Sequence, residues 1–161
     1  MHSFFKNQNY PPVINKKEIY NLCSQKLQAK IQFIEGALND LKSANQNDSK
    51  SSAGDKHETA GAMLHLEQEK LSRQLGELLV QKKQFQQINP ELHSEQVVQG
   101  SLIECKEGWI YISIALGNIS YSSTNVTVIS IDSPLAKSLA AAKKGDIVTV
   151  NTRKYHLLQV L

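Results

Sequence analysis

Residues 42–62 read KSANQNDSKSSAGDKHETAGA, and this stretch decides the fold. Its 21 residues include no Val, Ile, Leu, Met, Phe, Trp, Tyr or Cys. A segment without large apolar side chains cannot anchor itself in a hydrophobic core, so we expect it at a solvated surface. Because apolar residues recur at helical spacing on both sides of it, we predict that it forms the tip between two antiparallel helices.

The two flanking segments each carry one narrow apolar stripe. In the first, the apolar residues lie three or four positions apart, as on one face of an α-helix with an almost heptad repeat. Because a narrow stripe suits a helix that packs against a single partner, residues 16–89 are predicted to form a long antiparallel helical hairpin, or coiled coil. The stripes are Tyr20, Cys23, Leu27, Ile31, Ile34, Leu38 and Leu41, then Leu64, Leu71, Leu75, Leu78, Phe85 and Ile88, with Gln68 and Lys82 at the skipped positions.

The composition changes near Asn89-Pro90. Seven of the nine valines lie after residue 96, and the only tryptophan is Trp109. These residue types favour strands, whereas the first half is rich in helix-forming Leu, Gln, Lys, Glu and Ala. Short strands of an antiparallel sheet are therefore predicted at 100–105, 109–115, 125–130, 146–151 and 155–160.

One helix is predicted within this second half, at 134–142. Ser133 is placed to cap its first turn, and Pro134 suits the first helical position, where no N–H is needed. Lys143-Lys144 would complement the negative end of the helix before Gly145. The predicted fold class is therefore α+β, with the helical hairpin followed by a small antiparallel sheet domain carrying one helix. Its parts are an N-terminal extension at 1–15, the hairpin at 16–89 with its tip at 42–62, a linker at 90–99 and the C-terminal domain at 100–161.

Charge, cysteines and hydropathy exclude several classes of protein. The 18 Lys and Arg against 15 Asp and Glu give a formal charge of +3 with no concentrated block, which is weak support for nucleic-acid binding. Cys23 and Cys105 have no metal-ligand spacing. The N-terminus lacks a signal-peptide core, and no run approaches the roughly 20 apolar residues of a membrane span. We expect a cytoplasmic monomer without a membrane segment.

One group of chemically active residues stands out, at the predicted tip. The sequence has no nucleophile elbow, no glycine-rich phosphate loop and no Cys/His cluster, so an independent enzyme is not expected. Asp55 and Glu58, three residues apart, begin the second helix. They fit a capping box, and they also fit two carboxylates that share a divalent ion with another protein, because Mg²⁺ often uses one or two carboxylates. The two interpretations are compatible, and both stay open.

Several motifs together resemble the bacterial Gre transcript-cleavage factors, of the GreA and GreB type. The stretch ISIDSPLAKSL at 129–139, followed by KGDIV at 144–148, is similar to the C-terminal signature of that family. The tip pattern Gly54-Asp55-x-x-Glu58 resembles the family's Gly-Asp-x-x-Glu, and Gly100-Ser101 resembles the entry to its C-terminal domain. The order of hairpin, linker and small domain is also similar, so the resemblance covers roughly residues 16–161.

The resemblance implies a transcription elongation factor that acts as an accessory to RNA polymerase. Its FKBP-like C-terminal domain would dock at the rim of the secondary channel through Asp132, Ser133 and Pro134. The coiled coil would enter the channel, where Asp55 and Glu58 would help to hold a transient Mg²⁺ shared with the polymerase active site. The polymerase would then hydrolyse backtracked RNA, with the nascent RNA 3′ end and, indirectly, DNA as further partners.

The tip departs from the family pattern, and other functions stay open. Lys56-His57 stand where the family tends to have Leu-Ser, and a lysine charge would compete with a cation for the carboxylates. The alternatives are a channel-binding modulator or inhibitor without cleavage activity, a peptidyl-prolyl isomerase-like domain and a dimeric coiled-coil scaffold. An isomerase would need an aromatic proline pocket, for which the second half offers Trp109, Tyr111, Tyr121 and Tyr155.

Overall fold

The computed structural model describes residues 13–48 and 54–161, and these form two compact units. The helical unit spans Cys23–Asn89. The sheet unit is made of Pro90–Leu161 together with residues 13–22 from the beginning of the first helix. The long helix pair followed by a small sheet with one helix confirms the predicted fold class.

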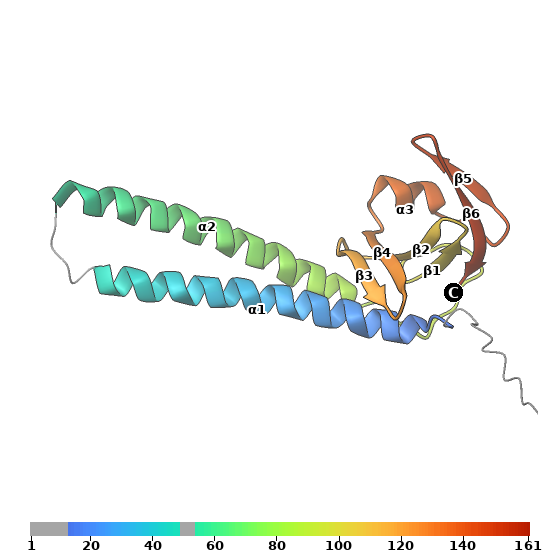
Figure 1. The fold of residues 1–161 in the computed structure, drawn as a ribbon, viewed down its shortest axis with the longest axis horizontal. Coiled ribbons are helices and arrows are strands. Elements are labelled where there is room, and N and C mark those ends of the chain that lie inside the picture. The colour runs from blue at the N-terminus through green and yellow to red at the C-terminus, as the bar shows by residue number, and fades with distance from the viewer. Residues whose placement is uncertain (1–12, 49–53) are drawn as a thin grey trace, which may run out of the picture. The chain divides into compact units, whose positions relative to one another are not determined.

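The hairpin consists of α1 (Lys16–Asp48) and α2 (Gly54–Phe85), which run antiparallel in Figure 1. With 33 and 32 residues, each helix is about 50 Å long at about 1.5 Å per residue. Asn15 caps α1, because its Oδ1 accepts the backbone N–H of Lys17 at 2.9 Å. Much of the polar stretch predicted as the tip is helical, at 42–48 and 54–62, and its connection at 49–53 lies outside the described residues.

The apolar stripes predicted from the sequence supply the buried positions of the hairpin. Gln68 and Lys82 are half-buried at the positions that the apolar pattern skips. There Lys82 Nζ donates a hydrogen bond to Gln28 Oε1 at 2.8 Å, which ties one helix to the other. The first stripe was predicted to begin at Tyr20, which is only half-buried. The fully buried residue is its neighbour Ile19. We call the buried residues Cys23, Leu27, Ile31, Leu38 and Leu71 the hairpin seam.

The sheet has six strands in the order β3-β4-β2-β1-β6-β5. Five of these strands overlap the segments predicted from the sequence. The bounds are β1 Leu102–Cys105, β2 Gly108–Ser113, β3 Gly117–Tyr121, β4 Thr124–Ser130, β5 Ile147–Val150 and β6 Arg153–Val160.

The sheet is mixed rather than wholly antiparallel, which corrects the prediction. β2 and β4 pair in parallel, with Trp109 opposite Val126 and Ser113 opposite Ser130. The reason is β3, which the sequence analysis missed. This edge strand runs antiparallel to β4 and intervenes in sequence between β2 and β4, so β4 returns in the same direction as β2.

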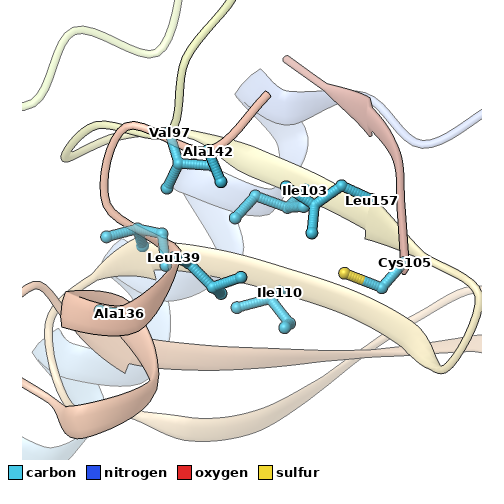
Figure 2. Packing of buried hydrophobic residues seen from close by; sticks show 9 residues of the cluster. Val97, Ile103, Cys105, Ile110, Ala136, Leu139, Ala142 and Leu157 are labelled. Carbon is cyan, nitrogen blue, oxygen red and sulfur yellow. The ribbon is translucent and has the colours of Figure 1, made fainter. Parts of the chain in front are cut away.

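One hydrophobic core of the sheet unit lies between the sheet and α3 (Pro134–Leu139). Figure 2 shows Leu139 of this helix near Ile110 of β2, and Ala136 belongs to the same buried cluster. Ile103 and Leu157 come from the neighbouring strands β1 and β6, and both are almost inaccessible to solvent. The core therefore fixes α3 against the strands that line the sites described below.

α3 ends at Leu139, three residues before the predicted end. The backbone of Val97 accounts for the difference, because it takes the hydrogen bonds that a longer helix would use. Its carbonyl accepts the N–H of Ala141 at 3.1 Å, and its N–H donates to the carbonyl of Ala142 at 2.7 Å. Ala141 adopts a φ of 60°, outside the helical region. Lys143 and Lys144 therefore follow a turn and do not complement the helix end.

The beginning of α1 is bonded into the sheet unit. Lys16 is buried, and its Nζ donates to the carbonyls of Leu92 at 2.5 Å and Leu161 at 3.0 Å. Burial lowers the pKa of this ammonium group. Beside it, Lys17 forms an exposed salt bridge with Glu91 at 2.9 Å. These bonds connect the beginning of α1 to residues near both ends of the 90–161 segment.

Candidate functional site

The predicted tip carboxylates lie on the first turns of α2. The helix begins at Gly54, so Asp55 is already helical and does not precede the helix as an N-cap residue would. Glu58 is exposed. The side chains of Asp55, Lys56 and His57 lie outside the described part of the structure. A helix N-terminus favours negative charge, because its first N–H groups are unpaired and its dipole is positive there.

The chain by itself offers few ligands for a metal ion. Among the residues that the structure describes, no group of three or more His, Cys, Asp or Glu side chains could hold one. Two carboxylates on one helical turn fit an ion that takes its remaining ligands from elsewhere, as Mg²⁺ commonly does from water and phosphate. This donor set of two carboxylates therefore suits an ion that is shared with another molecule.

The second predicted site, Asp132-Ser133-Pro134, is a corner of the sheet unit that is held by local hydrogen bonds. Ser133 caps α3 as predicted, because its Oγ accepts the N–H of Ala136 at 3.1 Å. Ser130 fixes the preceding turn, since its carbonyl accepts the N–H of Ser133 at 3.0 Å and its Oγ accepts that of Asp132 at 3.2 Å. Asp132 and Pro134 are exposed beside this cap. The corner is therefore a rigid surface that presents one carboxylate and one proline ring.

A third site, which the motifs did not reveal, is a cavity of about 530 Å³ in the sheet unit. Cys105 and Ile110 contribute its buried apolar part, and Leu135 reaches it from α3. Trp109 and Tyr155 are half-buried lining residues, and the cations Arg153 and Lys154 contribute to the same cavity from β6. In the sequence, only the single tryptophan, Trp109, could have drawn attention to this cavity.

The aromatic residues considered for a proline pocket are divided among different places. Trp109 and Tyr155 line this cavity, whereas Tyr111 is fully buried in β2 and Tyr121 donates a hydrogen bond to Glu18. Burial raises the pKa of the Cys105 thiol to about 11, so this cavity residue is a weak nucleophile at neutral pH. Two aromatic rings form only part of the pocket that an isomerase would need.

The architecture is a long helix pair followed by a small mixed sheet with one helix. No protein-family profile and no curated protein matches the chain. Two similar solved structures are the transcription factor Gfh1 and the crystal structure of GreA factor homolog 1 (Gfh1) of Thermus thermophilus. The first is 16% identical over 85% of this chain and 92% of that one, with a TM-score of 0.34. The second is 14% identical over 86% and 94%, with a TM-score of 0.32.

These values are too low to carry an argument about function, so the sites must be judged from the residues of this chain. No helix in the described ranges, 13–48 and 54–161, is both long and apolar enough to cross a membrane.

Proposed function

We propose that this chain is a Gre-type transcription factor that binds RNA polymerase. The carrying observation is the pairing of two helices of 33 and 32 residues whose stretch nearest the connection is polar. A helix pair of about 50 Å is long enough to extend into a deep channel. Its polar end is suited to an aqueous cavity that contains metal and nucleic acid. This function places the protein in the cytoplasm, as a monomer.

In this proposal the Asp132-Ser133-Pro134 corner docks on the rim of the polymerase secondary channel. Its local hydrogen bonds preorganise the corner, so little conformational entropy is lost on binding. Asp132 supplies a charge for recognition, and Pro134 supplies an apolar contact of fixed shape. Because both are exposed, they can be changed without disturbing the core.

The same proposal gives Asp55 and Glu58 a role inside the channel. They would hold a Mg²⁺ together with the polymerase and its RNA. Bound there, the ion would polarise water for hydrolysis of a backtracked transcript. The chain would then stimulate a reaction that belongs to the polymerase and would not be an enzyme itself.

The test uses purified full-length protein and bacterial core RNA polymerase. Co-purification measures binding, and shortening of RNA in stalled complexes measures cleavage. We expect Asp132→Asn/Pro134→Ala to weaken co-purification about tenfold or more, with Glu95→Gln as an exposed control on the same unit. Absence of co-purification with the unmodified protein would refute the proposed function.

A second comparison separates cleavage from simple occupancy of the channel. Asp55→Asn/Glu58→Gln should abolish RNA shortening while co-purification is retained. Asp40→Asn/Glu69→Gln removes the same charges elsewhere on the hairpin and should leave cleavage unchanged. If the unmodified protein binds without shortening RNA, the alternative of a channel-binding modulator replaces cleavage stimulation.

A further inference from the structure

The cavity in the sheet unit has the size and composition of a ligand site. Its volume of about 530 Å³ lies within the roughly 300–1,000 Å³ that is typical of small-ligand pockets. Cys105, Ile110 and Leu135 give it an apolar part that can accept one or two apolar side chains. Another cavity of the same unit, of about 640 Å³, is bordered by Val13 and Ile14 and by the lysines at the beginning of α1.

The hydrogen-bond acceptors around the smaller cavity are already engaged. The carboxylate of Glu107 contacts Nδ1 of His156 at 2.8 Å and accepts the His156 backbone N–H at 3.1 Å. Asn125 Oδ1 accepts from Ser120 Oγ at 3.1 Å, and Asn118 Oδ1 accepts from Thr127 Oγ1 at 3.0 Å. These bonds fix the orientation of the polar side chains that line the cavity.

The two cations of the cavity, Arg153 and Lys154, are available to a ligand. Neither Arg153 nor Lys154 takes part in a salt bridge within the described part of the chain, and both are exposed. Glu107 also lines the cavity and is held by His156, so the cavity presents two cations and one carboxylate, and its charge is positive on balance. Charge complementarity therefore points to an anionic ligand with an apolar portion.

We propose that this cavity binds an acidic peptide segment of a partner protein, with an apolar side chain inserted between Leu135 and Tyr155 and its carboxylates on Arg153 and Lys154. Trp109 borders the inserted group and contributes apolar contact area. This site adjoins the Asp132-Ser133-Pro134 corner through Leu135 but differs from it in chemistry, because it is concave and carries two cations. The proposal does not depend on polymerase binding.

The experiment uses the only tryptophan of the chain as its reporter. A blocked octapeptide with six carboxylates around a central Leu-Phe pair is titrated into the full-length protein while Trp109 emission is recorded. We expect a saturable change in emission, weaker at 300 mM than at 20 mM salt because of screening. The isosteric peptide with Gln and Asn for Glu and Asp, and the acidic peptide with Gly-Gly at its centre, should each bind at least tenfold more weakly.

Matched charge variants locate the site. Arg153→Gln/Lys154→Gln should weaken binding of the acidic octapeptide roughly tenfold, the usual effect of losing two exposed ion pairs. Lys143→Gln/Lys144→Gln removes the same charge from exposed positions outside the cavity and should leave binding unchanged. Circular dichroism and the thermal midpoint of each variant establish that both remain folded.

Several results would overturn the proposal. These are no emission change with the acidic peptide, equal weakening in the two double variants, or equal binding of the Gly-Gly peptide. Tighter binding of an octauridine RNA than of the peptide would assign the cavity to single-stranded nucleic acid instead.

Discussion

The helical unit and the sheet unit bury their apolar residues to different extents. In the sheet unit, Ile103, Ile112 and Leu139 are all 0% exposed. Along the hairpin seam the exposed fraction reaches 8% at Leu38 and 9% at Leu71. Near the tip, Glu58 on α2 is exposed.

This difference follows from how each unit surrounds its apolar residues. A sheet that packs against a helix surrounds each core residue on several sides, whereas two paired helices cover one narrow stripe. The hairpin tolerates Gln68 and Lys82 at half-buried positions because their polar ends reach solvent or a partner such as Gln28. We therefore expect substitutions in the sheet core to cost more stability than equivalent ones in the hairpin seam.

The largest effect is expected for Leu139→Ala in the sheet core. It should lower the free energy of unfolding by about 4 kcal/mol, because the leucine is fully enclosed and leaves a cavity. Leu38→Ala in the seam should cost about 2 kcal/mol, because neighbouring side chains or water can fill the space. Urea unfolding followed by Trp109 fluorescence reports on the sheet unit, and circular dichroism at the helical minimum reports mainly on the hairpin. Equal losses would remove the distinction between the two units.

A smaller effect is expected for Ser133→Ala. The substitution removes the acceptor of the Ala136 N–H and should destabilise the sheet unit by about 1 kcal/mol. Ser133→Asp keeps an acceptor and should restore most of the loss, which distinguishes capping from any other role of the hydroxyl. The Trp109-detected unfolding midpoint measures both variants. An unchanged midpoint in Ser133→Ala would show that the cap contributes no net stability.

The seam can be strengthened by a similar or smaller amount. Gln68→Leu places an apolar side chain at a half-buried skipped position and should raise hairpin stability by about 0.5–1 kcal/mol. Glu69→Leu, at the exposed neighbouring position, should give no such gain. Circular dichroism in urea distinguishes the two. A loss of stability in Gln68→Leu would mean that the polar residue is needed where it stands.

The smallest effect concerns the pH dependence of the sheet unit. The hydrogen bond with His156 holds the pKa of the exposed Glu107 carboxyl below its ordinary value of 4.5. A lowered pKa in the folded state adds stability that is present above about pH 4.5 and is lost as the pH falls through the folded pKa. Glu107→Gln should therefore reduce the acid-induced drop in thermal midpoint below about pH 4.5, whereas Glu95→Gln should behave like the unmodified protein. Superimposable pH profiles would contradict this linkage.

Local patterns predicted the elements whose structure depends on nearby residues. The helical spacing of Cys23, Leu27 and Ile31 identified buried positions of α1 because one face of a helix repeats every 3.6 residues. Ser133 was identified as a cap because the interaction spans only three residues. The exposed corner at Asp132 and Pro134 followed from the same motif. Its binding role remains a proposal.

Contacts between distant residues account for what the sequence did not predict. β3 was missed because Ile119 is the only buried residue of that edge strand, so the alternation of buried and exposed positions is weak. The early end of α3 depends on Val97, which lies far from the helix in sequence. The cavity brings together Cys105, Leu135 and Tyr155 from three separate elements. No local spacing indicates such an arrangement.

The division of α1 between the two units has a consequence for synthesis of the chain. Residues 13–22 belong with 90–161, so the sheet unit is discontinuous and the helical segment is inserted within it. Domains generally fold as their residues leave the ribosome, N-terminal parts first. The contiguous helix pair can form as soon as Asn89 emerges, but Lys16 must wait for Leu161, 145 residues later, before both of its carbonyl partners exist. Until then the first turns of α1 lack much of their native burial. A chaperone that binds nascent chains would cover their exposed apolar residues during this interval.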